Sequence, residues 1–175
     1  MMQSFAERRK YALISVMTAL ALSIWILEEF IPRPAPWFKP GFSYIVILAS
    51  FELLGSTSAI AIAYLRVVVG SMLLGKLFSP AFILSLSGTT AAILIMTVML
   101  SWGRRLFSFV GVSVAGAFCH IAAQIVVAGA IFYRPDAVVW MLPPLTIWAF
   151  IAGSVVGVVS AKVTERLTNS TLIKA

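Results

Sequence analysis

The sequence predicts an all-α membrane protein, a single bundle of about six transmembrane helices. Hydrophobic residues make up 61% of the 175 positions and charged residues only 11%. A soluble domain carries about 25% charged residues, so this chain lacks the polar side chains that would cover a globule. The apolar residues also gather in runs that approach the roughly 20 residues a helix needs to cross a bilayer.

Six such runs follow one another, and we interpret residues 1–175 as one transmembrane domain. The expected spans are 11–31, 42–54, 57–74, 80–102, 106–132 and 137–162. The first is longer than the apolar core of a signal peptide, so we expect it to be retained. The proline-rich stretch 32–41 ends it, because prolines cannot sustain helical hydrogen bonds. The second run is short for a full span.

The basic residues predict the orientation, because cytoplasmic loops carry the excess of lysine and arginine. With the N-terminus inside, the cytoplasmic set is Arg8, Arg9, Lys10, Arg104, Arg105, Lys162, Arg166 and Lys174. The smaller outer set is Arg33, Lys39, Lys76 and Arg134. We therefore expect a multi-pass protein of a bacterial cell (inner) membrane with both termini in the cytoplasm. Because the basic residues cluster at span ends, the net charge of +7 does not indicate nucleic-acid binding.

The residues that catalysis or metal binding requires are missing from the sequence. The segment 70–77 spells most of a P-loop, but Leu77 stands where Ser or Thr must reach magnesium. Asp136 is the only aspartate, so an aspartate-rich magnesium site is excluded. His120 and Cys119 are the single histidine and cysteine, too few for a metal cluster. We expect no catalysis by the chain itself, no cofactor and no metal.

Polar residues at membrane depth are costly and mark candidate functional sites. Arg66 lies near the middle of the third span, and Glu52 near the cytoplasmic end of the second. Arg66 either forms a structural ion pair with Glu52 or Glu28, or it belongs to a site for an anion. His120 and Gln124 are four residues apart and share one helix face. Their side chains either form hydrogen bonds between neighbouring helices or contact a ligand.

Small residues mark faces where helices approach closely in lipid. One such face on the first span is formed by Ala12, Ser15, Ala19 and Ser23. Another, on the sixth span, is formed by Gly153, Gly157 and Ala161. Either face could pack inside the chain or dock a separate membrane subunit.

Four motifs together resemble one family of membrane proteins. They are the proline-rich loop 31–41 with Lys39, the segment 65–71 around Arg66, the segment 75–88, and the segment 109–120 that ends in His120. Gln124 follows the last of them. The combination resembles the Gx transporters, a family also labelled heptaprenyl diphosphate synthase component I. That family is in turn similar to the substrate-binding S components of energy-coupling factor transporters.

The resemblance implies a six-helix fold, a ligand pocket that opens outward, and partners that comprise a transmembrane coupling subunit and ATPases. Under it, the substrate-binding candidates are Arg66, His120, Gln124, Lys39 and Glu52, and the docking face is that of Ala12, Ser15, Ala19 and Ser23. Two positions depart from the family pattern. Tyr44 stands where the family often has Asn, and Ile121 stands where Asn often follows the histidine.

These observations favour a membrane-embedded, S-component-like subunit for uptake of a small cofactor-like or vitamin-like molecule. A second interpretation is an accessory membrane subunit of prenyl-diphosphate or quinone synthesis, as the family label states. A third, from a different class, is an assembly subunit of a membrane redox complex.

Overall fold

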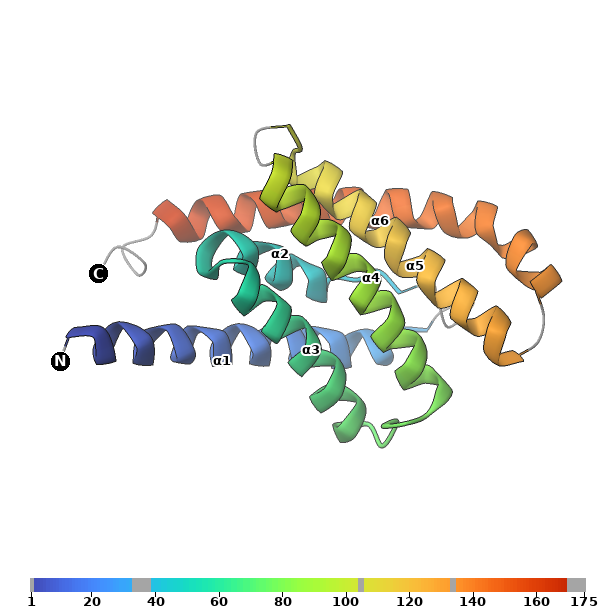
Figure 1. The fold of residues 1–175 in the computed structure, drawn as a ribbon, viewed down its shortest axis with the longest axis horizontal. Coiled ribbons are helices and arrows are strands. Elements are labelled where there is room, and N and C mark those ends of the chain that lie inside the picture. The colour runs from blue at the N-terminus through green and yellow to red at the C-terminus, as the bar shows by residue number, and fades with distance from the viewer. Residues whose placement is uncertain (1, 33–38, 104–105, 133–134, 170–175) are drawn as a thin grey trace.

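The described part of the chain is a bundle of six α-helices (Figure 1). This computed structural model describes residues 2–32, 39–103, 106–132 and 135–169, and these ranges contain no strand. The helices are α1 (Met2–Glu29), α2 (Ser43–Leu54), α3 (Ser56–Leu73), α4 (Pro80–Gly103), α5 (Phe109–Phe132) and α6 (Pro135–Asn169). The prediction of an all-α fold is confirmed. The largest differences from the predicted ranges are the earlier start of α1 and the later end of α6.

Five of these helices are long and apolar enough to cross a membrane, and α2 is the exception. Its 12 residues cover about 18 Å, against a hydrocarbon thickness of about 30 Å. Gly55 alone connects α2 to α3, with a φ of +84° that favours glycine. The chain is therefore a multi-pass membrane protein with one helix of partial length.

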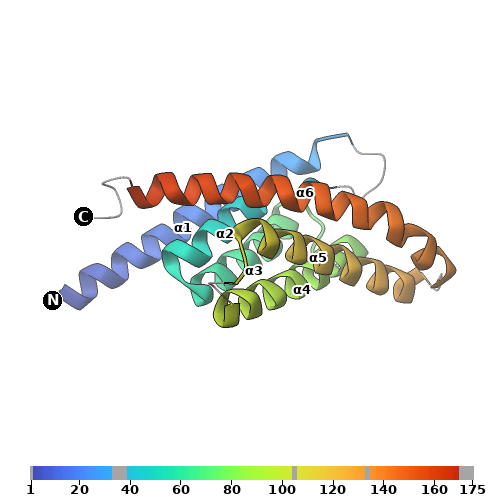
Figure 2. The same ribbon diagram turned by 90° about the horizontal axis from the view of Figure 1, so that it is seen from above.

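Helix α1 begins and helix α6 ends at the same end of the elongated bundle (Figures 1 and 2). We call this the terminal end, and the opposite end, where α1 and α3 finish and α4 begins, the distal end. Helix α5 packs against α4 and α6, while α2 packs against α1, α3 and α6. Which end faces the cytoplasm stays a prediction. Several residues of the charge count lie outside the described ranges, namely Arg33, Arg104, Arg105, Arg134 and Lys174.

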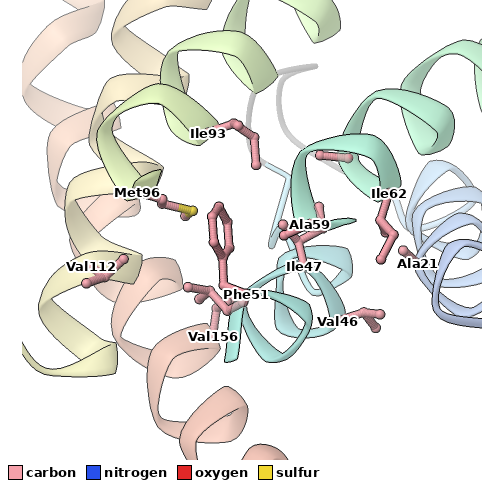
Figure 3. Close-up of a cluster of buried hydrophobic side chains, with 12 residues drawn as sticks. Ala21, Val46, Ile47, Phe51, Ala59, Ile62, Ile93, Met96, Val112 and Val156 are labelled. Atoms are coloured by element: carbon pink, nitrogen blue, oxygen red, sulfur yellow. The ribbon is translucent and has the colours of Figure 1, made fainter. Parts of the chain in front are cut away.

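An apolar core closes the bundle near its terminal end. Phe51 of α2 lies among Met96 of α4, Val112 of α5 and Val156 of α6, all of them buried (Figure 3). Four helices therefore meet around one aromatic ring. This core fixes the spacing between α2 and the three helices that follow α3.

Glycines allow α6 to lie directly on α5. A Cβ at Gly157 would stand 2.6 Å from the Val110 Cα, and one at Gly153 would stand 2.8 Å from the Val114 Cα. Backbone atoms cannot move aside as flexible side chains do. Gly153 and Gly157 of the sixth span therefore pack inside the chain, one of the two alternatives that the sequence left open.

Candidate ligand-binding site

A cavity of about 610 Å³ lies inside the bundle, within the range typical of small-molecule sites. One face of α5 lines it with Gly116, His120, Gln124 and Ala128, at the four-residue spacing that the sequence predicts for a shared face. The ends of α1 and α3, the segment 39–44, α4 and α6 complete the wall.

Arg66 is the most deeply buried charge in the cavity wall, with 1% of its surface exposed. Its Nη1 donates to the Ser43 hydroxyl at 2.6 Å and its Nη2 to the Thr89 hydroxyl at 3.0 Å. The guanidinium carbon lies 4.6 Å from the centre of the Tyr44 ring. Its Nε has no hydrogen-bond partner. Neutral hydroxyls and a ring face thus contact a permanent positive charge, and the buried Glu28 carboxylate lies near enough for the two charges to interact.

The ion pair considered between Arg66 and Glu52 does not form. Ser43, at the start of α2, lies level with Arg66, whereas Glu52 follows nine residues later, about 13 Å along the helix. Glu52 is exposed and does not line the cavity. Glu28 does line it and is 2% exposed, but its Oε1 accepts a hydrogen bond from the Phe42 N–H at 2.6 Å. Its Oε2 has no hydrogen-bond partner.

His120 is held between α2 and α4. The Tyr44 hydroxyl lies 2.9 Å from its Nδ1, and the two rings meet edge to face. The Gly88 backbone lies within hydrogen-bonding reach of the imidazole. A neutral ring with its proton on Nε2 satisfies both partners, donating to the Gly88 carbonyl and accepting from Tyr44; we assign this tautomer from the partners. Tyr44 therefore connects the Arg66 charge to His120.

Gln124 lies one helical turn beyond His120 and lines the same cavity. Its amide has no side-chain hydrogen bond to any residue within the described ranges. An amide carries two donors and an acceptor that need partners when withdrawn from water. Gln124 is thus available to a molecule in the cavity.

An ion-pair cluster stands at the distal opening. Glu29 pairs with Lys39 and, at 2.9 Å, with Lys76. The Lys39 ammonium lies 4.8 Å from the centre of the Trp25 ring, and the Trp148 indole donates to the Lys39 carbonyl at 3.1 Å. These contacts fasten the segment that leads into α2 across the top of the cavity.

The pKa of Lys39 is lower than that of an ordinary lysine. Burial lowers the pKa of Lys39 from 10.5 to about 8. The negative charge of Glu28 opposes this shift, whereas the positive charges of Lys76 and Arg66 add to it. The cavity wall carries three permanent or titrating cations, Lys39, Arg66 and Lys76, against the carboxylates of Glu28 and Glu29. Counted as formal charges, these five side chains sum to +1.

The structure brings four of the five predicted substrate-binding residues to this cavity: Arg66, His120, Gln124 and Lys39. Sequence reasoning did not assign Tyr44 to the site, although it noted the residue as a departure from the family pattern. It also missed the ion pairs of Glu29 with Lys39 and Lys76. These three residues come from three separate segments of the chain, and spacing along the sequence does not show that they meet.

No other helix of the described ranges covers the predicted docking face of α1. Its four small residues, Ala12, Ser15, Ala19 and Ser23, are all exposed. In the described ranges, no group of three metal-binding side chains lies together.

Together, these observations describe a polytopic helical membrane protein with an internal cavity. Residues 17–163 match the family model described as heptaprenyl diphosphate synthase component I. The chain belongs to this family. No curated protein and no solved structure matches the chain.

Proposed function

We propose that this protein is a membrane-embedded substrate-binding subunit that takes up a small, cofactor-like or vitamin-like molecule. The observation that carries the proposal is the internal cavity, in which a buried guanidinium and an unpaired amide face the same space. Buried charges in membrane proteins require an opposite charge or a ligand. Among the described residues Arg66 forms no ion pair, because the nearby Glu28 carboxylate, whose charge acts on Arg66, accepts its hydrogen bond from the Phe42 N–H instead.

The closed end of the cavity supports binding over free passage. Met96 and Val156 line it and also belong to the apolar core around Phe51. A molecule that enters at the distal end therefore meets a packed floor. Release of the molecule on the opposite side of the membrane requires a conformational change of the bundle. This requirement is consistent with a subunit that is driven by partner proteins.

The exposed small-residue face of α1 is the proposed contact for a transmembrane coupling subunit that works with ATPases. Small side chains let another helix approach closely in lipid. The resemblance to S components of energy-coupling factor transporters supplies the kind of partner. The chain then binds the substrate, and ATP hydrolysis belongs to the partners.

The test is to purify the protein with its native lipids and identify bound small molecules by mass spectrometry. We expect one molecule per chain, lost in Arg66→Met and Gln124→Ala and kept in Glu52→Gln, which changes an exposed residue outside the cavity. Equal retention by all three variants would remove the cavity from the proposal.

A second candidate function is favoured by the family match: an accessory membrane subunit of prenyl-diphosphate synthesis. The family description supports it, and the apolar part of the cavity is compatible with an isoprenoid. A prenyl diphosphate bound to the purified protein, together with synthesis that needs a soluble partner, would support this candidate over uptake. Binding of a vitamin-like molecule would support the first.

A further inference from the structure

The room for a ligand lies in the distal half of the cavity, because direct contacts fill the other half. A Cβ at Gly116 would stand 2.1 Å from the Met96 Cε, and one at Gly153 would stand 3.2 Å from the Ala117 Cβ. Helices α4, α5 and α6 therefore touch one another at this level. A bound molecule lies between the ends of α1 and α3, the segment 39–44, and the facing parts of α4 and α5.

The charged groups at the distal opening already have partners. Glu29 pairs with Lys39 and with Lys76, and the side chain of Lys76 is 43% exposed. Solvent at the opening therefore screens the extra positive charge of this cluster. The cluster does not need an anionic ligand to balance it.

Deeper in the cavity wall, two buried side chains of opposite charge each keep an atom without a partner. Glu28 and Arg66 are 2% and 1% exposed, both line the cavity, and their charges interact. Among the residues that the structure describes, the Glu28 Oε2 is an acceptor without a donor and the Arg66 Nε is a donor without an acceptor. The pair as a whole carries no net charge. It therefore needs hydrogen-bond partners and no counter-ion.

An uncharged amide lies in the same wall. Gln124 lines the cavity, and its side chain has no side-chain partner within the described ranges. A carboxamide both donates and accepts, so a second amide satisfies it by giving one hydrogen bond and taking one. The groups that need partners therefore all ask for a molecule with adjacent donors and acceptors.

We propose that the ligand is an uncharged planar ring with amide-type edges, that is a lactam, a cyclic ureide or an imide, bound between Glu28, Arg66 and Gln124. This inference rests on the proposed uptake function and names the class of its substrate. On one edge of the ring, an N–H donates to the Glu28 carboxylate and a neighbouring carbonyl accepts from the Arg66 guanidinium. Another edge pairs with the Gln124 amide.

Ions suit this place less well than a neutral ring. A carboxylate or phosphate would meet the Glu28 carboxylate as well as Arg66, and a cation would meet Arg66 as well as Glu28. Like charges repel strongly where little water separates them, and this repulsion offsets the attraction to the opposite charge. A planar ring also finds aromatic neighbours, since Trp25, Tyr44 and Phe82 line the cavity.

The first experiment compares planar molecules of similar size by titration calorimetry on the purified full chain in a non-ionic detergent. Quinazoline-2,4-dione carries amide N–H and carbonyl groups, and we expect it to bind 1:1 with a Kd below about 0.1 mM. Its 1,3-dimethyl derivative has no N–H and should bind at least tenfold more weakly, because a hydrogen bond to a charged group is lost. Naphthalene-2-carboxylate, a planar anion, should also bind at least tenfold more weakly. Equal or tighter binding of the carboxylate, or no binding of the dione, would overturn the proposal.

Substitutions then assign the contacts. Glu28→Gln keeps a carbonyl oxygen for the Phe42 N–H, but it removes the carboxylate from the ligand and leaves the Arg66 charge unbalanced. We expect it to weaken dione binding at least tenfold and to strengthen carboxylate binding, whereas a merely structural role of Glu28 would weaken both. Gln124→Met should weaken dione binding at least fivefold, while Val126→Met, at an exposed residue of the same helix, leaves it unchanged. The comparison of ligands uses the unaltered protein, so it decides the matter even if a variant does not fold.

The molecule that co-purifies with the native protein separates this inference from the proposed function. A small molecule with an amide-bearing ring supports both. A molecule with a phosphate or carboxylate and no amide edge would reject this inference and leave the uptake function standing. A native protein that carries no small molecule and binds none of the three probes would count against both.

Discussion

Substitution of Gly88 by alanine tests how tightly α4 packs against His120 and Gln124 of α5. A Cβ at position 88 would lie 2.8 Å from both Cε1 and Nε2 of His120 and 2.9 Å from the Gln124 Cγ. Ordinary contact begins at about 3.4 Å, so the imidazole must move by about 0.6 Å. Overpacking of this kind costs about 1–3 kcal/mol, and loss of the Tyr44–His120 hydrogen bond about 1 kcal/mol. Helix propensity returns about 1 kcal/mol, which leaves a net loss of about 1–3 kcal/mol.

The assay is equilibrium unfolding in mixed micelles, followed by circular dichroism. Gly111→Ala is the control, because a Cβ there meets only the Ser108 hydroxyl oxygen, at 3.6 Å, and we expect no loss of stability. Tyr44→Phe completes a double-mutant cycle. It should cost about 1 kcal/mol alone and almost nothing in the Gly88→Ala background, where the bond to His120 is already broken. Strictly additive losses, or a Gly88→Ala variant as stable as the control, would refute the described packing.

Three further predictions follow from the same contacts. Arg66→Met should change the free energy of unfolding by less than about 2 kcal/mol, because the two lost hydrogen bonds, at about 1.5–3 kcal/mol each, are offset by removal of a buried charge whose desolvation costs several kcal/mol; a larger loss would show that Arg66 has a structural role. Ala19→Leu should reduce co-purification of a membrane partner without changing monomer stability, whereas Ala61→Leu, at an exposed alanine of α3, should do neither. Reporter fusions at the two termini should report the same compartment, and opposite compartments would contradict an even number of crossings.

The helices could be predicted from the sequence because each apolar run carries its own limits. Prolines and glycines interrupt the runs at positions such as Gly55, Pro32 and Pro80, and the observed ends lie close to them. The shared face of His120 and Gln124 was equally predictable, since it depends only on the period of one helix.

The partners of Arg66 could not be predicted in this way. A buried arginine is usually matched with a carboxylate, and the sequence offers Glu52 and Glu28 in neighbouring helices. Which residue of α2 faces Arg66 depends on the level at which α2 begins, and periodicity does not specify it. The structure places Ser43 there, so hydroxyls take the role expected of a carboxylate.

The level of α2 also explains why so many polar residues gather at the distal end. Helix α3 is six residues longer than α2, so the chain enters α2 about 9 Å below the end of α3. Non-helical backbone inside a membrane bundle needs partners from the protein, because no lipid group can supply them. The Glu28 carboxylate accepts from the Phe42 N–H, and the Trp148 indole donates to the Lys39 carbonyl. Because α2 is short, the non-helical segment before it and the polar partners of that segment lie inside the bundle. The short α2 also leaves unfilled the space between Arg66 and the distal end, so the cavity and its charged residues have the same structural cause.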